Sequence, residues 1–486
     1  MTKTSTLVSR FRVALGGQAV VAASGVVVAV VLARLLGPTD YGLLFLALSI
    51  LSIFLTFSKL GIARSAARYI SEYKETNPGQ VPHIVRSSFW MNALTIAITC
   101  LVLLFSHRAI AVRVGEPNLA PFLLLGVLYL IFETLFVYFK YMLQGFERIE
   151  HSVLVKVTRN AGTAVFAVAF VLLGFGAFGA LGGYIFASFL STVVGAVLVR
   201  DNYTESISHV MEDGLRRRIA EYSVPITATS TMANLDKGMD IVLIGFFLNP
   251  AAVSFYVVAN QITTFIDKPM SAAGFTLSPT FGAEKAKQNT ERAGRIYEYT
   301  LLTALTFYIP ATAGLILVAG PVVELLFGSE YRGAVPVLQV LAVYAVFVAV
   351  LEITSHSLDY LGRARTRAVI RGVAAVCNLL LNIVLIPTVG VVGAAISTVV
   401  THGAYTLACV LLIHYEFGLD VGKITKRLGR ILGVTASMSL VVFVLVGYVT
   451  GWITLFLVVG IGFALWLGCS VAIGLVEPRD ALAILN

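Results

Sequence analysis

Charged side chains are scarce in this sequence. Asp, Glu, Lys and Arg together make up 13% of the 486 residues, hydrophobic residues make up 58%, and the mean hydropathy is +0.89. Soluble globular domains carry about 25% charged residues, so the composition excludes such a domain and predicts an integral membrane protein. The apolar runs do not alternate as barrel strands do, and helices satisfy their own backbone hydrogen bonds in lipid. The predicted fold class is therefore all-α and polytopic.

Cysteines and long polar loops are also few. The four cysteines, Cys100, Cys377, Cys409 and Cys469, lie in apolar stretches without CxxC spacing. This pattern excludes a disulfide framework and predicts no metal site. The polar connections are too short to hold a folded soluble domain, so we expect no catalytic residues, no cofactor and no enzyme activity. A membrane glycosyltransferase is accordingly the least favoured function.

Long apolar segments make up most of the chain. A membrane-spanning helix needs about 20 mostly apolar residues, and the sequence holds about 14 such segments. The first follows Met1-Thr2-Lys3 and is longer than the core of a typical signal peptide, so we expect an uncleaved span. The predicted domains are an N-terminal six-helix lobe (1–200), a cytoplasmic linker (201–221), a C-terminal six-helix lobe (222–415), a second cytoplasmic linker (416–427) and an additional C-terminal helix pair (428–486).

The two predicted lobes are tandem repeats. The Gly-Pro turn at Leu36–Leu43 predicts a helical hairpin in the bilayer, and a weaker copy of it stands at Leu248–Phe255. Gly176–Ala180 likewise matches Gly390–Ala394 at nearly the same offset. Each copy holds an even number of spans, so both enter the membrane from the same side. We therefore expect two pseudo-symmetric parallel lobes, with a substrate site between them.

The basic residues are unevenly distributed, although the formal net charge is +9. With a cytoplasmic N-terminus, the outer connections hold only Arg108, Arg113 and Arg332. This is the positive-inside pattern, which predicts a multi-pass plasma-membrane protein with both termini cytoplasmic and no nucleic-acid partner. Basic runs such as Arg216–Arg218 are explained by topology, and binding of anionic lipid headgroups is the alternative.

Three stretches carry a family resemblance: Ala33–Gly42, Asp240–Phe246 leading into Val253–Tyr256, and Asn378–Pro387 followed by Gly390–Ala395. They resemble the polysaccharide-synthesis, Wzx-type branch of the MOP flippase superfamily, which also includes the MATE multidrug exporters and the lipid II flippases. The resemblance covers nearly the whole chain, including the final helix pair. It implies MATE-like lobes that move a polyprenyl-phosphate or polyprenyl-diphosphate oligosaccharide from the cytoplasmic to the outer leaflet by alternating access.

The resemblance also implies the partners. These are the lipid-linked oligosaccharide itself, the surrounding membrane lipids and enzymes of surface polysaccharide or glycan assembly, and we expect the transporter to be a monomer. A cation-coupled multidrug or metabolite antiporter of the MATE type is the alternative function. Either transporter could use H+ or Na+ as a coupling ion.

Charged side chains inside spans are costly, by about 2.5 to 3.5 kcal/mol on insertion scales, and so mark candidate sites. Asp236, Lys237 and Asp240 lie near the middle of the seventh predicted span. They line the substrate cavity or form a self-paired triad. In the eighth span, Asp267 and Lys268 line the cavity or bridge helices, and the adjacent Pro269 predicts a hinge.

The other cavity candidates are three arginines. Arg34 reaches either the interface or a substrate phosphate. Arg64 and Arg68, one helical turn apart, lie where they could contact the diphosphate as it enters, although topology alone also explains them.

Four further titratable residues are candidates for proton or ion coupling: Glu133, Glu352, His356 and His402. The glutamates could equally form bridges to basic residues, and His402 could simply pack between helices. In this assignment the predicted spans contain three cations and five acids. The cations are Arg34, Lys237 and Lys268, and the acids are Glu133, Asp236, Asp240, Asp267 and Glu352. An acidic balance of this kind keeps the antiporter alternative open.

Overall fold

The protein is described here by a computed structural model covering residues 3–201, 211–265 and 290–476. Within these ranges the regular secondary structure consists of α-helices and short 3-10 or π-helical segments, and there is no β-strand. Ten of the helical stretches are long and apolar enough to cross a membrane. The prediction of an all-α, polytopic membrane protein is thereby confirmed. The chain divides into two compact units, Met1–Ser254 and Phe255–Asn486, and each is described separately below.

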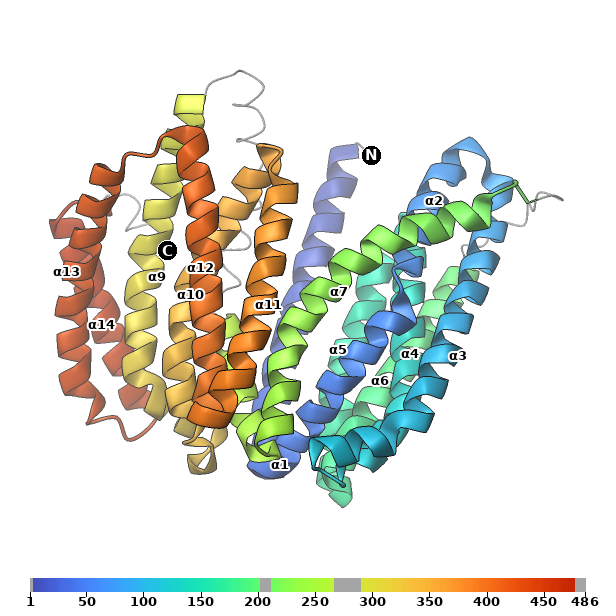
Figure 1. The fold of residues 1–486 in the computed structure, drawn as a ribbon, viewed down its shortest axis with the longest axis horizontal. Helices are drawn as coiled ribbons and strands as arrows, with labels where there is room; N and C mark the ends of the chain where they lie inside the picture. The colour runs from blue at the N-terminus through green and yellow to red at the C-terminus, as the bar shows by residue number, and fades with distance from the viewer. Residues whose placement is uncertain (1–2, 202–210, 266–289, 477–486) are drawn as a thin grey trace. The chain divides into compact units, whose positions relative to one another are not determined.

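In the described part of the first unit, seven α-helices precede the turn at Asn249 (Figure 1). They are α1 (Lys3–Lys59), α2 (Ile62–Thr76), α3 (Val81–Val114), α4 (Leu119–Gly145), α5 (Ile149–Phe170), α6 (Gly176–Arg200) and α7 (Leu215–Phe247). Helix α4 packs against α2, α3 and α6, while α5 packs against α1 and α6. Helix α7 packs along α1, α2 and α3 and so belongs to this unit.

The predicted hairpin turn lies inside α1. Gly37 has φ 71° and ψ 172°, a conformation that breaks the helix and that glycine adopts without steric cost. Pro38 follows as the first residue of the next helical segment, where its missing N–H leaves no hydrogen bond unmade. Figure 1 shows the chain running from the N-terminus along α1 and turning back toward α2.

The second copy of this turn follows α7. The helix ends at Phe247, and the side-chain Oδ1 of Asn249 accepts a hydrogen bond of 2.9 Å from the backbone N–H of Ala252. Asn249 thus caps the helical residues 250–265. Gly42 of α1 lies against this turn, since a methyl group on Gly42 would overlap the backbone carbonyl of Pro250.

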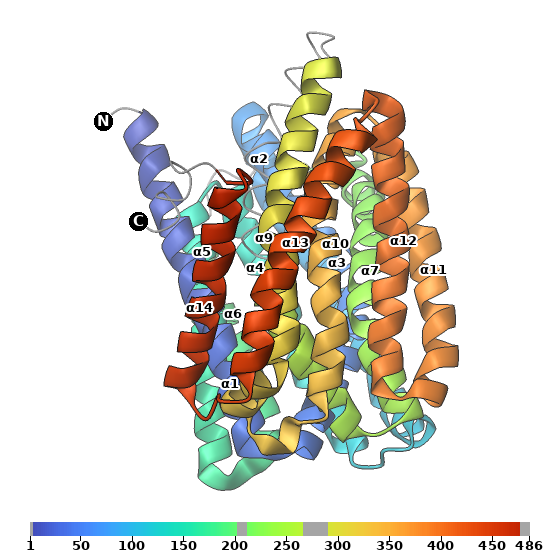
Figure 2. The same cartoon turned by 90° about the vertical axis from the view of Figure 1, so that its left-hand side faces the viewer.

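The second unit contains α9 (Thr290–Phe327), α10 (Ala334–Tyr360), α11 (Ala364–Val389), α12 (Val391–Phe417), α13 (Val421–Val446) and α14 (Trp452–Ala472). Helix α10 packs against α9 and α12, and α11 packs against α12. The additional C-terminal pair, α13 and α14, packs on α9, and both Figure 1 and Figure 2 show these three helices side by side. Val318, Met438 and Trp466 lie in the apolar core that joins these three helices.

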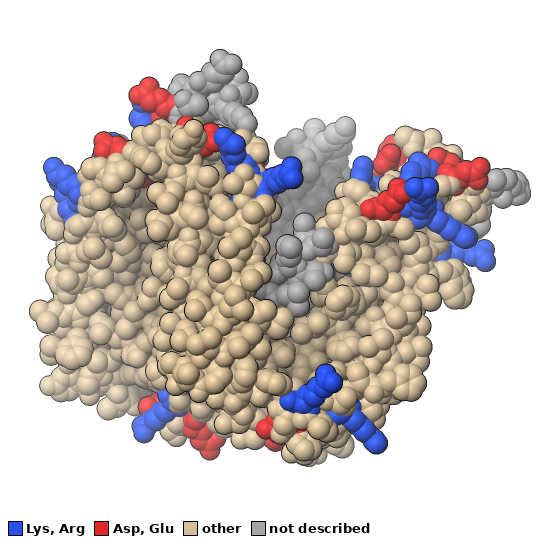
Figure 3. Space-filling model, viewed as in Figure 1, with Lys and Arg blue, Asp and Glu red and all other residues tan. Residues whose placement is uncertain are grey.

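The distribution of charge fits a membrane-embedded protein. On the face shown in Figure 3, the Lys, Arg, Asp and Glu side chains of each unit gather at the ends of the helices, and the middle is uncharged. Large apolar side chains such as Phe105, Leu172 and Phe443 are exposed along the helices. An exposed apolar band of this kind is stable in contact with lipid rather than with water.

Candidate functional site

A buried ion pair lies at the centre of the first unit. Glu133, in the middle of α4, has only 8% of its surface exposed. Its Oε2 accepts hydrogen bonds from Nε of Arg159 on α5 (3.1 Å) and from Oγ of Ser188 on α6 (2.8 Å). The Nη2 of Arg159 also donates to the hydroxyl of Tyr129 (3.2 Å). Three helices therefore meet at one carboxylate, whose hydrogen bonds offset part of the cost of burying the charges.

Close packing of α5 against α6 allows Arg159 and Ser188 to reach the same carboxylate. Gly183 of α6 lies directly on the backbone of Ala167 of α5, with no room for a methyl group. Small residues at a helix interface let two backbones approach closely. In the same helix pair, Gly162 faces Ala187, the residue next to Ser188. The small residues of α5 and α6 thus bring Arg159 and Ser188 to the same side of Glu133.

Further cations surround this ion pair. Lys59, at the end of α1, interacts electrostatically with Glu133, Arg159 and Arg64. Lys140, two turns beyond Glu133 on α4, interacts with Lys59 and Lys156. We call Lys59, Arg64, Lys140, Lys156 and Arg159, together with Glu133, the cationic cluster. Among the described residues, Arg159, Lys59 and Lys140 interact with Glu133 itself, Arg64 interacts with both lysines, and Lys156 interacts with Lys140.

Tyr141 holds two members of the cationic cluster in place. The Nε of Arg64 donates a hydrogen bond of 2.7 Å to the Tyr141 hydroxyl, and the guanidinium lies 5.3 Å from the ring centroid. The Nζ of Lys140 lies 4.5 Å from the centroid of the same ring. These cation–π contacts are favourable without neutralising either charge. Arg64 remains exposed and available to an anionic ligand.

The other two predicted arginines lie apart from the cluster's ion pair. Arg68 is exposed on α2 and its guanidinium stacks on Tyr222 of α7, 4.2 Å from the ring centroid. Arg34 is exposed in α1, about one helical turn before the reversal at Gly37.

The predicted charges of the second repeat are described only in part. Asp240 lies on α7 and is buried, with 5% of its surface exposed. Asp236 and Lys237 also belong to α7, but their side chains lie outside the described residues. Asp267, Lys268 and Pro269 lie outside the described residues altogether.

The titratable candidates of the second unit form two separate contacts. Glu352 and His356, one turn apart on α10, approach to 3.7 Å and are each about one-third exposed. His402 on α12 bonds through Nδ1 with the carbonyl of Thr398 (3.1 Å), and its ring stands edge-on to Tyr344 at 4.8 Å. Within the described part of the chain, no three His, Cys, Asp or Glu side chains gather as a metal site would require.

The structure changes the predicted balance of charge inside the helices. Lys59 and Arg159 are counted with the cytoplasmic basic residues in the sequence-based assignment, yet both belong to the cationic cluster. One signal in the sequence could have indicated the ion pair, because Glu133 and Arg159 each lie near the middle of an apolar segment. Residues at equal depth in neighbouring antiparallel spans can pair, but the identity of the neighbours is a tertiary property.

Several known proteins similar to this chain are named as glycan flippases or polysaccharide biosynthesis proteins. The model of a family described as polysaccharide biosynthesis protein matches residues 10–283, and one described as MatE matches residues 225–384. The probable low-salt glycan biosynthesis flippase Agl15 of Haloferax volcanii is 26% identical over 48% of both chains, so the match spans about half of that relative. The lipopolysaccharide biosynthesis protein WzxC of Escherichia coli is 25% identical over 71% of this chain and 67% of its own.

The fold is also known among solved structures. The structure of the lipid II flippase MurJ in an inward closed conformation superposes with a TM-score of 0.78 and covers 96% of this chain and 99% of its own, at 15% identity. At that identity the likeness establishes the fold alone. Together with the match over residues 10–283, it confirms the resemblance stated from the motifs.

Proposed function

Because this chain belongs to the polysaccharide biosynthesis protein family, we propose that it is a flippase for a polyprenyl-phosphate-linked or polyprenyl-diphosphate-linked oligosaccharide. The substrate moves from the cytoplasmic to the outer leaflet for assembly of a surface polysaccharide or glycan. The sugar and phosphates cross between the two lobes by alternating access, and the lipid tail stays in the bilayer. The relatives named as flippases or polysaccharide proteins support this assignment.

The observation that carries the proposal is the cationic cluster. Unpaired charge inside membrane helices is unfavourable, and the described residues of the cluster include an excess of basic side chains, five with one acid. A phosphate or diphosphate would compensate this excess, and arginine offers it two parallel hydrogen bonds. A drug-exporting antiporter, in contrast, needs acids to bind its cationic cargo and coupling ions.

We assign different roles to the members of the cluster. Glu133 is already bonded to Arg159 and Ser188, so it orients the guanidinium rather than binding substrate. Arg64 is exposed, and Lys140 forms no ion pair with an acid among the described side chains, so these two are the phosphate contacts. Glu352 with His356, and His402, remain the candidates for coupling to H+ or Na+.

The membrane potential could drive translocation of the substrate without a coupling ion. Two negative charges moving outward across about 100 mV, inside negative, release about 4.6 kcal/mol. We propose that the N- and C-termini are cytoplasmic, which the positive-inside pattern supports. We propose that the protein works in the plasma membrane as a monomer next to the glycan-assembly enzymes.

Restoration of glycan export tests the proposal. A strain lacking its own flippase, but able to make the lipid-linked oligosaccharide, would express Arg64→Ala, Lys140→Ala or the control Lys74→Ala. Lys74 pairs with Glu147 at the exposed end of α2 and is not a member of the cluster. We expect both cluster variants to deliver at least about tenfold less glycan to the outer leaflet, as loss of a charge-assisted contact predicts, and Lys74→Ala to deliver normally.

The same strains distinguish the alternative. If wild-type protein delivers no glycan but confers export of cationic drugs, and Asp240→Asn abolishes that export, the antiporter assignment replaces the flippase. Membrane levels of each variant, measured by immunoblot, separate loss of transport from loss of protein.

A further inference from the structure

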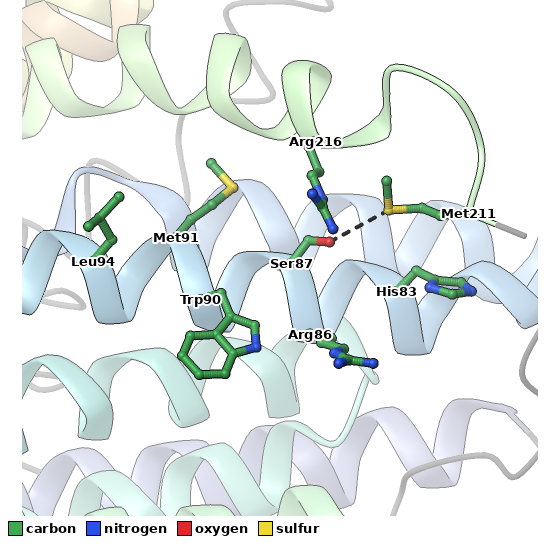
Figure 4. Close-up of a pocket in the computed structure, with 8 residues that line it drawn as sticks. All are labelled: His83, Arg86, Ser87, Trp90, Met91, Leu94, Met211 and Arg216. Carbon is green, nitrogen blue, oxygen red and sulfur yellow. Dashed lines mark hydrogen bonds between the residues drawn. The ribbon is translucent and has the colours of Figure 1, made fainter.

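A basic pocket in the first unit shares no lining residue with the cationic cluster. It has a volume of about 700 Å³ and opens between the N-terminal turns of α3 and α7. Figure 4 shows Arg216 descending from α7 toward Ser87, with Arg86 and Trp90 one turn apart on α3. The remaining lining residues are His83, Met91, Leu94 and Met211.

The two arginines of this pocket form no ion pair with an acid of the described residues. Glu212 accepts hydrogen bonds from Tyr73 and Arg218, and Glu221 pairs with Arg217 at 2.7 Å. No described acid lies within ion-pair distance of Arg86 or Arg216, and both side chains are exposed. Two guanidinium groups at one opening, without an acidic partner in the described part of the chain, favour an anionic ligand, and arginine's planar fork matches a phosphate group.

An apolar stripe continues from the pocket along α3. Its members recur every three or four residues, which places them on one face of the helix. They are Trp90, Leu94, Ile98, Leu101 and Phe105, exposed by 65%, 61%, 53%, 52% and 81%. A stripe that begins at a basic pocket and ends near the other end of a spanning helix has the dimensions of a lipid tail below its headgroup. Tryptophan at its start is typical of the interface between headgroups and hydrocarbon.

We propose that this pocket binds the phosphate headgroup of a membrane lipid, whose chain lies along the α3 stripe. The phosphate contacts Arg86 and Arg216, and Trp90 packs against the first carbons of the chain. The site is distinct from the cationic cluster, and it stands whether or not the chain transports a lipid-linked oligosaccharide. The shared chemistry is a phosphate on a long apolar chain, which either an anionic phospholipid or a polyprenyl phosphate supplies.

Lipid retention by the full-length protein tests this site. The protein would be placed in phosphatidylcholine nanodiscs containing either phosphatidylglycerol or a polyprenyl phosphate, and retained lipids would be counted by native mass spectrometry. We expect Arg86→Ala and Arg216→Ala each to weaken retention about fivefold, as loss of one basic contact predicts. Arg217→Ala is the matched control, because this neighbouring arginine carries the same charge but pairs with Glu221 and does not line the pocket.

Fluorescence supplies a second measurement. Lipids with brominated tails should quench Trp90, and Trp90→Phe identifies its share of the emission from the three tryptophans of the chain. Arg216→Ala should reduce that quenching and Arg217→Ala should not. Unchanged thermal unfolding of the variants in detergent establishes that they fold.

The outcomes separate the sources of the ligand. Arginine-dependent retention of either phosphate lipid supports the proposal, and the lipid retained more strongly identifies the source. Three results overturn it: equal loss in Arg216→Ala and Arg217→Ala, retention of phosphatidylcholine as strong as that of both phosphate lipids, or displacement by inorganic phosphate at concentrations equal to those of the lipids.

Discussion

Gly42 of α1 lies so close to the backbone carbonyl of Pro250 that no side chain fits between them. Both residues belong to the repeated turn motif: Gly42 lies in the first copy, and Pro250 stands in the second at the position of Pro38. The two copies of the turn therefore pack against each other. The glycine is required here for close approach rather than for an unusual φ angle.

Gly42→Ala should destabilise the protein by about 1–3 kcal/mol, because the added methyl group overlaps backbone rather than a movable side chain. The apparent unfolding temperature in detergent, followed by circular dichroism, measures the effect. Gly25→Ala is the matched control. Gly25 lies in the same helix with open space at its Cβ position, so alanine should leave stability unchanged or raise it by up to about 1 kcal/mol. Equal behaviour of the two variants would contradict the close approach.

Glu133→Gln should destabilise the protein strongly, by about 3–5 kcal/mol, because Arg159 loses its carboxylate partner inside the helix bundle. Arg159→Gln should have a similar cost. The double variant should recover part of this loss, with a coupling energy of about 1–3 kcal/mol. The unfolding temperatures of the wild type, the two single variants and the double variant form a double-mutant cycle that measures this coupling energy. The exposed pair Arg217–Glu221 is the control and should couple by less than about 1 kcal/mol; additive effects at Glu133 and Arg159 would argue against a buried pair.

The segment before α7 should open as the pH falls. The Tyr73 hydroxyl donates a hydrogen bond of 2.7 Å to Oε2 of Glu212, and this bond, with that from Arg218, holds the pKa of Glu212 below its ordinary value. A carboxyl group with a lowered pKa stabilises the folded state above its unfolded pKa of about 4.3. That contribution is lost as the pH falls through the lower, folded pKa.

Hydrogen exchange of peptides covering 211–218, measured across the acidic range, tests this dependence. Tyr73→Phe should move the opening transition to higher pH, toward the ordinary glutamate value. Tyr69→Phe is the control, since Tyr69 bonds the carbonyl of Arg218 and not Glu212. A transition that stays in place in Tyr73→Phe would show that this hydroxyl does not stabilise the carboxylate.

Asp240→Asn should reduce delivery of outer-leaflet oligosaccharide while leaving the protein in the membrane, because a buried carboxylate on α7 carries a charge that the amide does not. Lys268→Ala, at a position outside the described residues, should do the same. Glycan export by the strain described above gives the measurement. Normal delivery by both variants would remove the seventh and eighth spans from the substrate site.

Hydropathy and turn residues were enough to predict the helical membrane fold. Each span is a local property of about 20 residues, and Gly37-Pro38 marks its turn through backbone conformations that can be read from residue type. The additional C-terminal helix pair and the family motifs can likewise be recognised from short stretches of sequence. For this reason the prediction and the structure agree on the all-helical, multi-pass fold.

The cationic cluster depended on the tertiary structure. Arg159 is one basic residue in an apolar segment, and only the packing of α4, α5 and α6 brings it to Glu133 and Ser188. Lys59 joins them from the end of α1, far away in the sequence. Electrostatic energy depends on distance in space and on burial, and neither quantity can be read from one helix at a time. The sequence therefore identified the charged residues inside the helices incompletely, and the folded structure determined which of them act together.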